Sequence, residues 1–182
     1  MERLTAEDWI RAGLKSLARS GYAALKADAL ARELGITRGS FYWHFTDLAA
    51  FHSRVIAHWK ESATEAIIVE IERHAGPAER LDALLRRAFA RDGSLEIRMR
   101  SWAEDNVEAA RAVGDIDRRR RDYIARLLMQ AGVAPGPAAT RALLLYWAYL
   151  GAALSRDKLS GDRLQGLVAE LEQVGLRPPT AA

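Results

Sequence analysis

Residues 37–45 read TRGSFYWHF and directly follow LARELGI at residues 30–36. Gly35 lies where the C-terminus of a first helix needs a residue in the left-handed conformation. Thr37 is placed to cap the start of a second helix. The pattern therefore predicts two short helices joined by a tight turn.

The second of these helices has a buried side and an exposed side. Phe41 and Phe45 are four residues apart, so they share the side that packs against a core. The remaining sides carry Arg38, Ser40, Tyr42, Trp43 and His44. A guanidinium, a hydroxyl, an imidazole and aromatic rings with polar tips are groups that meet phosphates and base edges. The two helices therefore predict a helix-turn-helix that binds double-stranded DNA.

Residues 39–45, with the sequence GSFYWHF, resemble the recognition-helix signature of the tetracycline-repressor (TetR) family of transcriptional regulators. The resemblance continues upstream through Ile10, Ala12, Leu14, Leu17, Gly21 and Tyr22, over roughly the first third of the chain. It implies an N-terminal three-helix DNA-binding domain over residues 1–47, with the helix-turn-helix at about residues 26–45. It also implies a C-terminal helical bundle over residues 48–182 for effector binding and dimerisation.

The chain departs from the family pattern at two places. Four residues after the histidine the family commonly has a lysine that touches phosphate, and this chain has Leu48. The Ser/Thr pair that usually opens the second helix is replaced by Leu25 and Lys26, and Lys26 can supply a phosphate contact of its own. We therefore expect the DNA contacts to come from Lys26, Thr37, Arg38, Gly39, Ser40, Tyr42, Trp43 and His44. Leu48 leaves open an alternative, a helical small-molecule-binding module without specific DNA binding.

The charge is distributed unevenly. Residues 1–60 contain nine Lys and Arg against six Asp and Glu, whereas residues 61–182 contain eighteen of each kind. The whole net charge of +3 therefore lies in the segment with the helix-turn-helix. This placement favours electrostatic attraction to DNA, with chance scatter as the alternative.

The remainder of the chain has helical periodicity and no alternating strand pattern, so we expect an all-α protein. Helices are expected over residues 9–20, 48–74, 78–91, 95–105, 107–131, 138–155 and 161–174, with residues 132–137 as a linker. The content of hydrophobic residues, 49%, is enough for a packed core.

The sequence also bears on the compartment in which the protein acts. It contains no cysteine, which fits a reducing cytoplasm. Its first residues do not form an apolar signal segment. The longest apolar run, residues 142–154, is too short to cross a bilayer as a helix. We therefore expect a cytoplasmic protein without a membrane partner.

The helix expected over residues 138–155 is apolar nearly all round and must be covered on two sides. One side can pack on the chain's own core and the other on a second copy, whereas a central helix in a monomer is the alternative. The last expected helix adds an apolar seam at helical spacing. We expect a homodimer whose interface contains Ala142, Tyr146, Tyr149, Ala153, Leu164, Leu167 and Leu171.

An effector pocket is expected in the C-terminal helices, where large amphipathic side chains gather. The candidate lining residues are Met99, Trp102, Tyr123, Leu127, Tyr146 and Trp147, and ordinary core packing is the alternative for each. The chain has no Gly-rich phosphate loop, Gly-x-Ser-x-Gly elbow or His-Glu-x-x-His helix, so we expect neither an enzyme nor a bound metal or cofactor. The resemblance to the TetR family implies a repressor that a small molecule releases from a near-palindromic operator.

Overall fold

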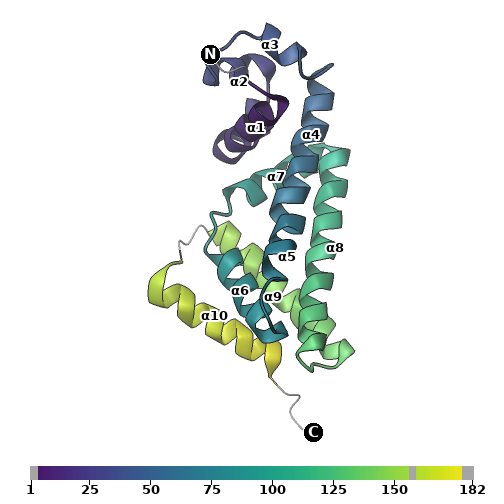
Figure 1. The fold of residues 1–182 in the computed structure, drawn as a ribbon, viewed down its shortest axis with the longest axis vertical. Coiled ribbons are helices and arrows are strands. Elements are labelled where there is room, and N and C mark those ends of the chain that lie inside the picture. The colour runs from purple at the N-terminus through teal and green to yellow at the C-terminus, as the bar shows by residue number, and fades with distance from the viewer. Residues whose placement is uncertain (1–3, 156–158, 178–182) are drawn as a thin grey trace. The chain divides into compact units, whose positions relative to one another are not determined.

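The computed structural model describes residues 4–155 and 159–177. Every regular element in those ranges is a helix, so the all-α prediction is confirmed (Figure 1). η1 is a short 3₁₀ helix and η2 a π-helix. In chain order the elements are α1 (Ala6–Ser20), η1 (Tyr22–Ala24), α2 (Ala27–Glu33), α3 (Gly39–Tyr42), α4 (Leu48–Lys60), η2 (Glu61–Glu65), α5 (Ala66–Ile71), α6 (Pro77–Phe89), α7 (Ser94–Asp105), α8 (Val107–Gln130), α9 (Pro135–Ser155) and α10 (Gly161–Leu176).

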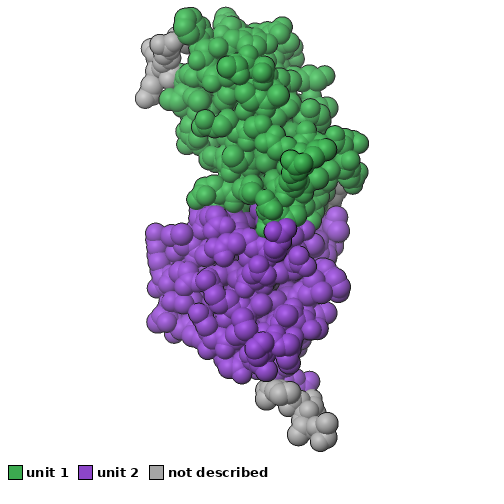
Figure 2. Space-filling view, turned by 90° about the vertical axis from the view of Figure 1, so that its right-hand side faces the viewer, with its two compact units in different colours: residues 1–63, 94–115 green, residues 64–93, 116–182 purple. Residues whose placement is uncertain are grey.

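The chain forms two compact units, which are coloured separately in Figure 2. Unit 1 contains residues 1–63 and 94–115, and unit 2 contains residues 64–93 and 116–182. Each unit is therefore built from segments that are distant in the sequence. The functional boundary expected between residues 47 and 48 lies inside unit 1 and stays a prediction.

Unit 1 contains a cluster of aromatic rings from α1, α3 and α4. Phe41 of α3 packs edge-on against Trp9 of α1 and against Phe51 of α4, with a centroid distance of 5.3 Å in both pairs. Gly13 allows α1 to approach α4 closely, because a β-carbon there would lie 2.7 Å from Cζ of Phe51. These contacts hold the short helix α3 by its buried side.

The turn between α2 and α3 has the geometry that its glycine predicts. Gly35 has φ = 68°, in the left-handed region. The amide of Gly35 donates to the carbonyl of Arg32 at 3.2 Å, and the amide of Ile36 donates to the carbonyl of Ala31 at 3.0 Å. This pair of hydrogen bonds closes the C-terminus of α2, so the predicted turn is confirmed.

The second helix of the motif is shorter than expected. The sequence predicts a helix over residues 37–45, whereas α3 spans only Gly39–Tyr42. Its N-cap is Arg38 and no side chain caps it, so the prediction that Thr37 caps this helix is wrong. The packing of Phe41, rather than a cap, holds so short a helix in place.

The long helix expected over residues 48–74 is interrupted. α4 ends at Lys60, η2 follows it, and α5 ends at Ile71. Asp47 caps the start of α4, since its side chain accepts a hydrogen bond of 2.7 Å from the amide of Ala50. A single π-turn within a helix is rare, and the spacing of apolar residues did not predict it here.

The linker expected over residues 132–137 is shorter than predicted, because α9 begins at Pro135. Proline suits the first turn of a helix, where its missing N–H would have no partner within the helix. α9 contains the longest apolar run of the sequence. In the two described ranges, no helix is long and apolar enough to span a membrane.

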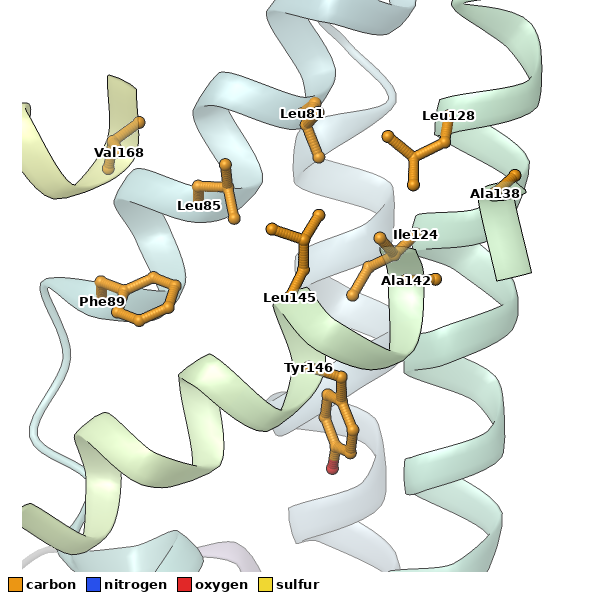
Figure 3. Packing of buried hydrophobic residues seen from close by; sticks show 10 residues of the cluster. All are labelled: Leu81, Leu85, Phe89, Ile124, Leu128, Ala138, Ala142, Leu145, Tyr146 and Val168. Atoms are coloured by element: carbon orange, nitrogen blue, oxygen red, sulfur yellow. The ribbon is translucent and has the colours of Figure 1, made fainter. Parts of the chain in front are cut away.

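Unit 2 has its main core between α6, α8, α9 and α10 (Figure 3). Leu81 and Leu85 of α6 pack in this cluster with Leu145 of α9, Leu128 of α8 and Val168 of α10. A second, smaller cluster joins α5 to α8 and contains Ile68, Ile71, Tyr123 and Leu127. α9 and α10 therefore each use one face to cover the core of their own unit.

Candidate functional site

The exposed side of α3 and its flanking turns carries the polar and aromatic side chains that the sequence predicts there. Tyr42 and Trp43 are exposed, and Trp43 keeps 78% of its surface accessible. Arg38 lies at the N-terminus of this helix and is also exposed. Of the other predicted residues in this segment, Thr37 and Gly39 are exposed, whereas Ser40 and His44 are half-buried. The predicted contact residues therefore lie together on one short segment.

The two positions that depart from the family pattern lie at helix starts. Lys26 is the N-cap residue of α2 and is exposed, which leaves its ammonium available for the expected phosphate contact. Leu48 is the first residue of α4 and is half-buried. It cannot form the ion pair that a lysine would form with phosphate.

Arg38 has two neighbours that orient its side chain. One of its terminal nitrogens donates a hydrogen bond of 2.9 Å to the hydroxyl of Tyr42. Its Nε lies 3.4 Å from a carboxylate oxygen of Asp28 on α2. The hydrogen bond to Tyr42 and, second, the charge of Asp28 raise the pKa of Arg38 above its ordinary value. Asp28 was not predicted, because a contact between two helices depends on how they cross.

The predicted effector residues are divided between the two units. Met99 and Trp102 are buried on α7 in unit 1. Trp102 stacks on Tyr22 at 4.8 Å and lies edge-on to His52 at 5.4 Å. Its indole N–H is buried without a hydrogen-bond acceptor. This unsatisfied donor is a polar group that a ligand can satisfy.

The other predicted effector residues belong to unit 2 and point in different directions. Tyr123 and Leu127 pack in the small cluster with α5. Burial and the nearby Glu72 carboxylate raise the pKa of Tyr123 to about 12. Tyr146 is buried and donates a hydrogen bond of 2.6 Å to Asp117, whereas Trp147 is exposed. Successive helical residues diverge by about 100°, which explains this last difference.

A surface cavity of about 470 Å³ in unit 2 contains none of the predicted effector residues. It is lined by His74, Ala78, Glu79, Asp82, Ala83 and Glu172. Burial, followed by the charge of Asp82, raises the pKa of Glu172. Among the residues that the structure describes, no group of three or more His, Cys, Asp or Glu side chains could hold a metal ion.

The residues predicted at a dimer interface largely face the core of their own unit. Ala142 and Tyr146 are buried in that core, and the interface predicted there stays a prediction. The other predicted residues, Tyr149, Leu164, Leu167 and Leu171, are partly buried against the same core, and Ala153 lies against Gly93. The exposed apolar side chains of α9 are instead Leu144, Trp147 and Leu154, with 47%, 58% and 67% of their surfaces accessible. They lie at helical spacing on one side of the helix.

The N-terminal helices match a known family. Residues 10–50 match the model described as bacterial regulatory proteins, tetR family. This segment extends from α1 to the first turn of α4 and contains the whole helix-turn-helix. The resemblance predicted from the recognition-helix residues is confirmed. A search of curated proteins finds no match.

Solved structures with a similar fold cover nearly the whole chain. A transcriptional regulator from Rhodococcus sp. RHA1 is 18% identical over 96% of this chain and 97% of its own, with a TM-score of 0.77. FadR from Bacillus subtilis, in complex with stearoyl-CoA, is 15% identical over 95% and 98%, with a TM-score of 0.69. A transcriptional regulator from Saccharomonospora viridis, in complex with choline, is 18% identical over 92% and 93%, with a TM-score of 0.71.

Proposed function

We propose that the protein is a DNA-binding transcriptional repressor, which a small-molecule effector releases from its operator, since residues 10–50 match the model of the tetR family of bacterial regulatory proteins. The exposed face of α3 carries this proposal. Arg38, Tyr42 and Trp43 are exposed there, while Phe41 is buried on the opposite side of the helix and packs against Trp9. A guanidinium beside aromatic rings on a short helix suits the major groove.

The proposed DNA contacts are of two kinds: some side chains read base edges, and others position the protein by contacting phosphates. Arg38 and Ser40, near the N-terminus of α3, read base edges, and Trp43 offers an apolar surface to a thymine methyl group. Phosphate contacts come from Lys26, Tyr42 and His44, and the backbone at Thr37 and Gly39 approaches the DNA strand.

A near-palindromic operator requires two recognition helices, and we assign the dimer contact to the exposed stripe of α9. This stripe, defined as Leu144, Trp147 and Leu154, consists of the large apolar side chains that α9 leaves exposed. Ala142 and Tyr146 are already buried within one chain and cannot cover a second copy. The stripe can pack against the same stripe of a second copy, because a two-fold interface uses the same surface on both subunits.

Effector control is proposed to act through Trp102. Two of the similar structures hold a ligand, stearoyl-CoA or choline. In this chain the buried indole N–H of Trp102 lacks an acceptor, and an effector that accepts this hydrogen bond would satisfy it. Met99 lies one helical turn away on α7. Tyr123 and Leu127, in unit 2, are the second candidate for the effector site.

Trp102 is connected to the helix-turn-helix through one layer of side chains. It contacts the rings of Tyr22 and His52, and Nε2 of His52 lies 3.0 Å from the carbonyl oxygen of Leu25. Leu25 directly precedes the N-cap of α2. A ligand at Trp102 can therefore bias the position of α2, and the coupling must be reciprocal.

One observation favours a second candidate function. Leu48 occupies the position of the usual phosphate-contacting lysine, which suits a ligand-binding module without specific DNA binding. Selection from a pool of random duplexes separates the two. The repressor selects a near-palindromic motif, whereas the module enriches no motif while it still binds a ligand.

A further inference from the structure

Asp28 is the one carboxylate that contacts the proposed base-reading side chain in the part of the chain that the structure describes. It lies in the first turn of α2 and is exposed, as is Arg38. The distance from its Oδ1 to Nε of Arg38 is 3.4 Å. On its other side, Arg38 donates to the Tyr42 hydroxyl at 2.9 Å, and its guanidinium carbon lies 5.5 Å from the centroid of the Tyr42 ring.

Stability does not account well for this arrangement. Exposed ion pairs contribute little to the free energy of folding, because water and salt screen them. A carboxylate beside the surface that meets DNA also repels phosphates. A structural role is available, since an acidic residue in the first turn of a helix interacts favourably with the helix dipole. That role concerns α2 alone and does not involve Arg38.

The geometry instead points to a role in sequence recognition. We infer that Asp28 is a specificity-determining residue, which orients Arg38 toward a guanine and weakens its attraction to phosphates elsewhere on DNA. The inference rests on the proposed function, because it concerns how Arg38 reads DNA. Asp28 acts through Arg38 and is therefore a positioning residue.

The chemistry of the guanidinium supports both effects. Arginine has five N–H donors, and the contacts with Asp28 and Tyr42 occupy its Nε side and one terminal N–H. The other donors can still form the bidentate contact with O6 and N7 of guanine. The fixed orientation favours this contact. On random DNA, the Asp28 charge offsets that of Arg38, so non-specific attraction falls.

The test compares Asp28→Asn with Glu7→Gln. Both changes remove one negative charge from unit 1, but Glu7 pairs with His58, at 3.2 Å, and does not contact Arg38. For Asp28→Asn, we expect the ratio of operator affinity to random-DNA affinity to fall by about fivefold or more, because the guanine contact loses its orientation. Affinity for random DNA should rise, with a salt dependence steeper by about one unit. Glu7→Gln should leave the ratio close to that of the wild type.

Two further variants distinguish orientation of Arg38 from other roles. Asp28→Glu keeps the charge and should restore part of the ratio. In an Arg38→Ala background, Asp28→Asn should not change the ratio further, because the side chain that it orients is gone. Thermal unfolding of Asp28→Asn shows whether the fold is retained. If Asp28→Asn unfolds, Asp28→Glu is compared with Asp28 in chains that carry Arg38 and in chains that carry Arg38→Ala. This comparison also shows whether residue 28 acts through Arg38.

Selection from random duplexes decides the outcome. The inference predicts that Asp28→Asn loses its preference at the same symmetric pair of operator positions as Arg38→Ala. An unchanged motif and ratio would overturn it, and so would relaxation at a different position, which would mean that Asp28 reads a base itself. If Glu7→Gln changed the ratio as much as Asp28→Asn does, the effect would be one of net charge, and the inference would be wrong. If the wild type selects no motif at all, the proposed function fails, and that result differs from every one of these.

Discussion

The hydroxyl of Tyr42 accepts a hydrogen bond of 2.9 Å from Arg38, one helical turn earlier on the exposed side of the helix-turn-helix. The residue proposed to position the phosphate backbone thus supports the residue proposed to read a base. Changes at Tyr42 and at Lys26 should therefore differ, although the sequence assigns both residues to phosphate.

Lys26→Ala should weaken binding to operator and random DNA about equally and reduce the salt dependence by about one unit, because it removes one phosphate contact. Lys26 is exposed at the N-cap of α2, where its side chain forms no capping hydrogen bond, so the fold should be unaffected. Fluorescence anisotropy over a salt series measures both quantities. A changed sequence preference with an unaltered salt dependence would show that Lys26 reads a base.

Tyr42→Phe should reduce affinity for random DNA in the same way, but it should also lower the preference for the operator. It removes the hydroxyl that accepts from Arg38, and an orienting hydrogen bond contributes about 0.5–1.5 kcal/mol. The operator preference should therefore fall by roughly two- to tenfold. If Tyr42→Phe lowered the affinities for operator and random DNA equally, Tyr42 would not be orienting Arg38 for base reading.

The dimer contact should depend on Trp147. Trp147→Asp places a carboxylate in the proposed stripe of α9, and burying it unpaired between subunits costs several kcal/mol. The chain should become monomeric while its helical content is retained. Val69→Asp is a matched control, since Val69 of α5 is also exposed, with 59% of its surface accessible. Sedimentation velocity distinguishes monomer from dimer.

Leu167→Asp should behave differently from Trp147→Asp. Leu167 is partly buried against the core of its own unit, so a charge there should lower the melting temperature. The folded chains should still form dimers. A Leu167→Asp chain that is stably folded and monomeric would restore the sequence-based placement of the interface on α10. A dimeric Trp147→Asp chain would exclude the stripe.

Trp102→Phe tests the effector site. Phenylalanine can keep the ring contacts with Tyr22 and His52 but lacks the indole N–H. The fold and DNA binding should persist, while affinity for effectors found in a thermal-shift screen falls by roughly two- to tenfold through the lost hydrogen bond. A large loss of stability would identify Trp102 as core alone. Unchanged effector affinity would favour the site at Tyr123.

The start of α1 provides a prediction about pH. Hydrogen bonds from the side chain and backbone of Thr5, and then from Arg11, lower the pKa of Asp8 to about 2 from an ordinary 3.8. A lowered carboxyl pKa contributes stability that is present above pH 3.8 and lost as the pH falls through about 2. Asp8→Asn should therefore lower the melting temperature at pH 7, and the difference should disappear near pH 2. A difference that is constant with pH would exclude the charged capping box as its cause.

Local signals in the sequence were sufficient for the helical class and for the turn of the motif. The left-handed conformation of Gly35 follows from the residues beside it, because a glycine after a helical segment closes it in this way. The four-residue spacing of Phe41 and Phe45 likewise placed both side chains in the core. In each case the neighbours within one turn determine the outcome.

The features that were missed depend on contacts between helices. α9 is apolar on opposite sides, so periodicity gives two faces without deciding which one covers the core, and the structure buries Ala142 and Tyr146. The contact between Asp28 and Arg38 joins two helices and depends on their crossing. The π-turn before α5 was also missed, and it contains the buried Thr64, five positions after the buried Trp59.

Selection from random duplexes with wild type and Arg38→Ala shows whether the exposed face of α3 reads a near-palindromic operator. The wild type should enrich one near-palindromic motif. Arg38→Ala should lose preference at a single symmetric pair of positions, with a discrimination loss of about 1–3 kcal/mol there. If both proteins gave the same motif with the same preferences, or the wild type gave no motif, α3 would not be the base-reading element.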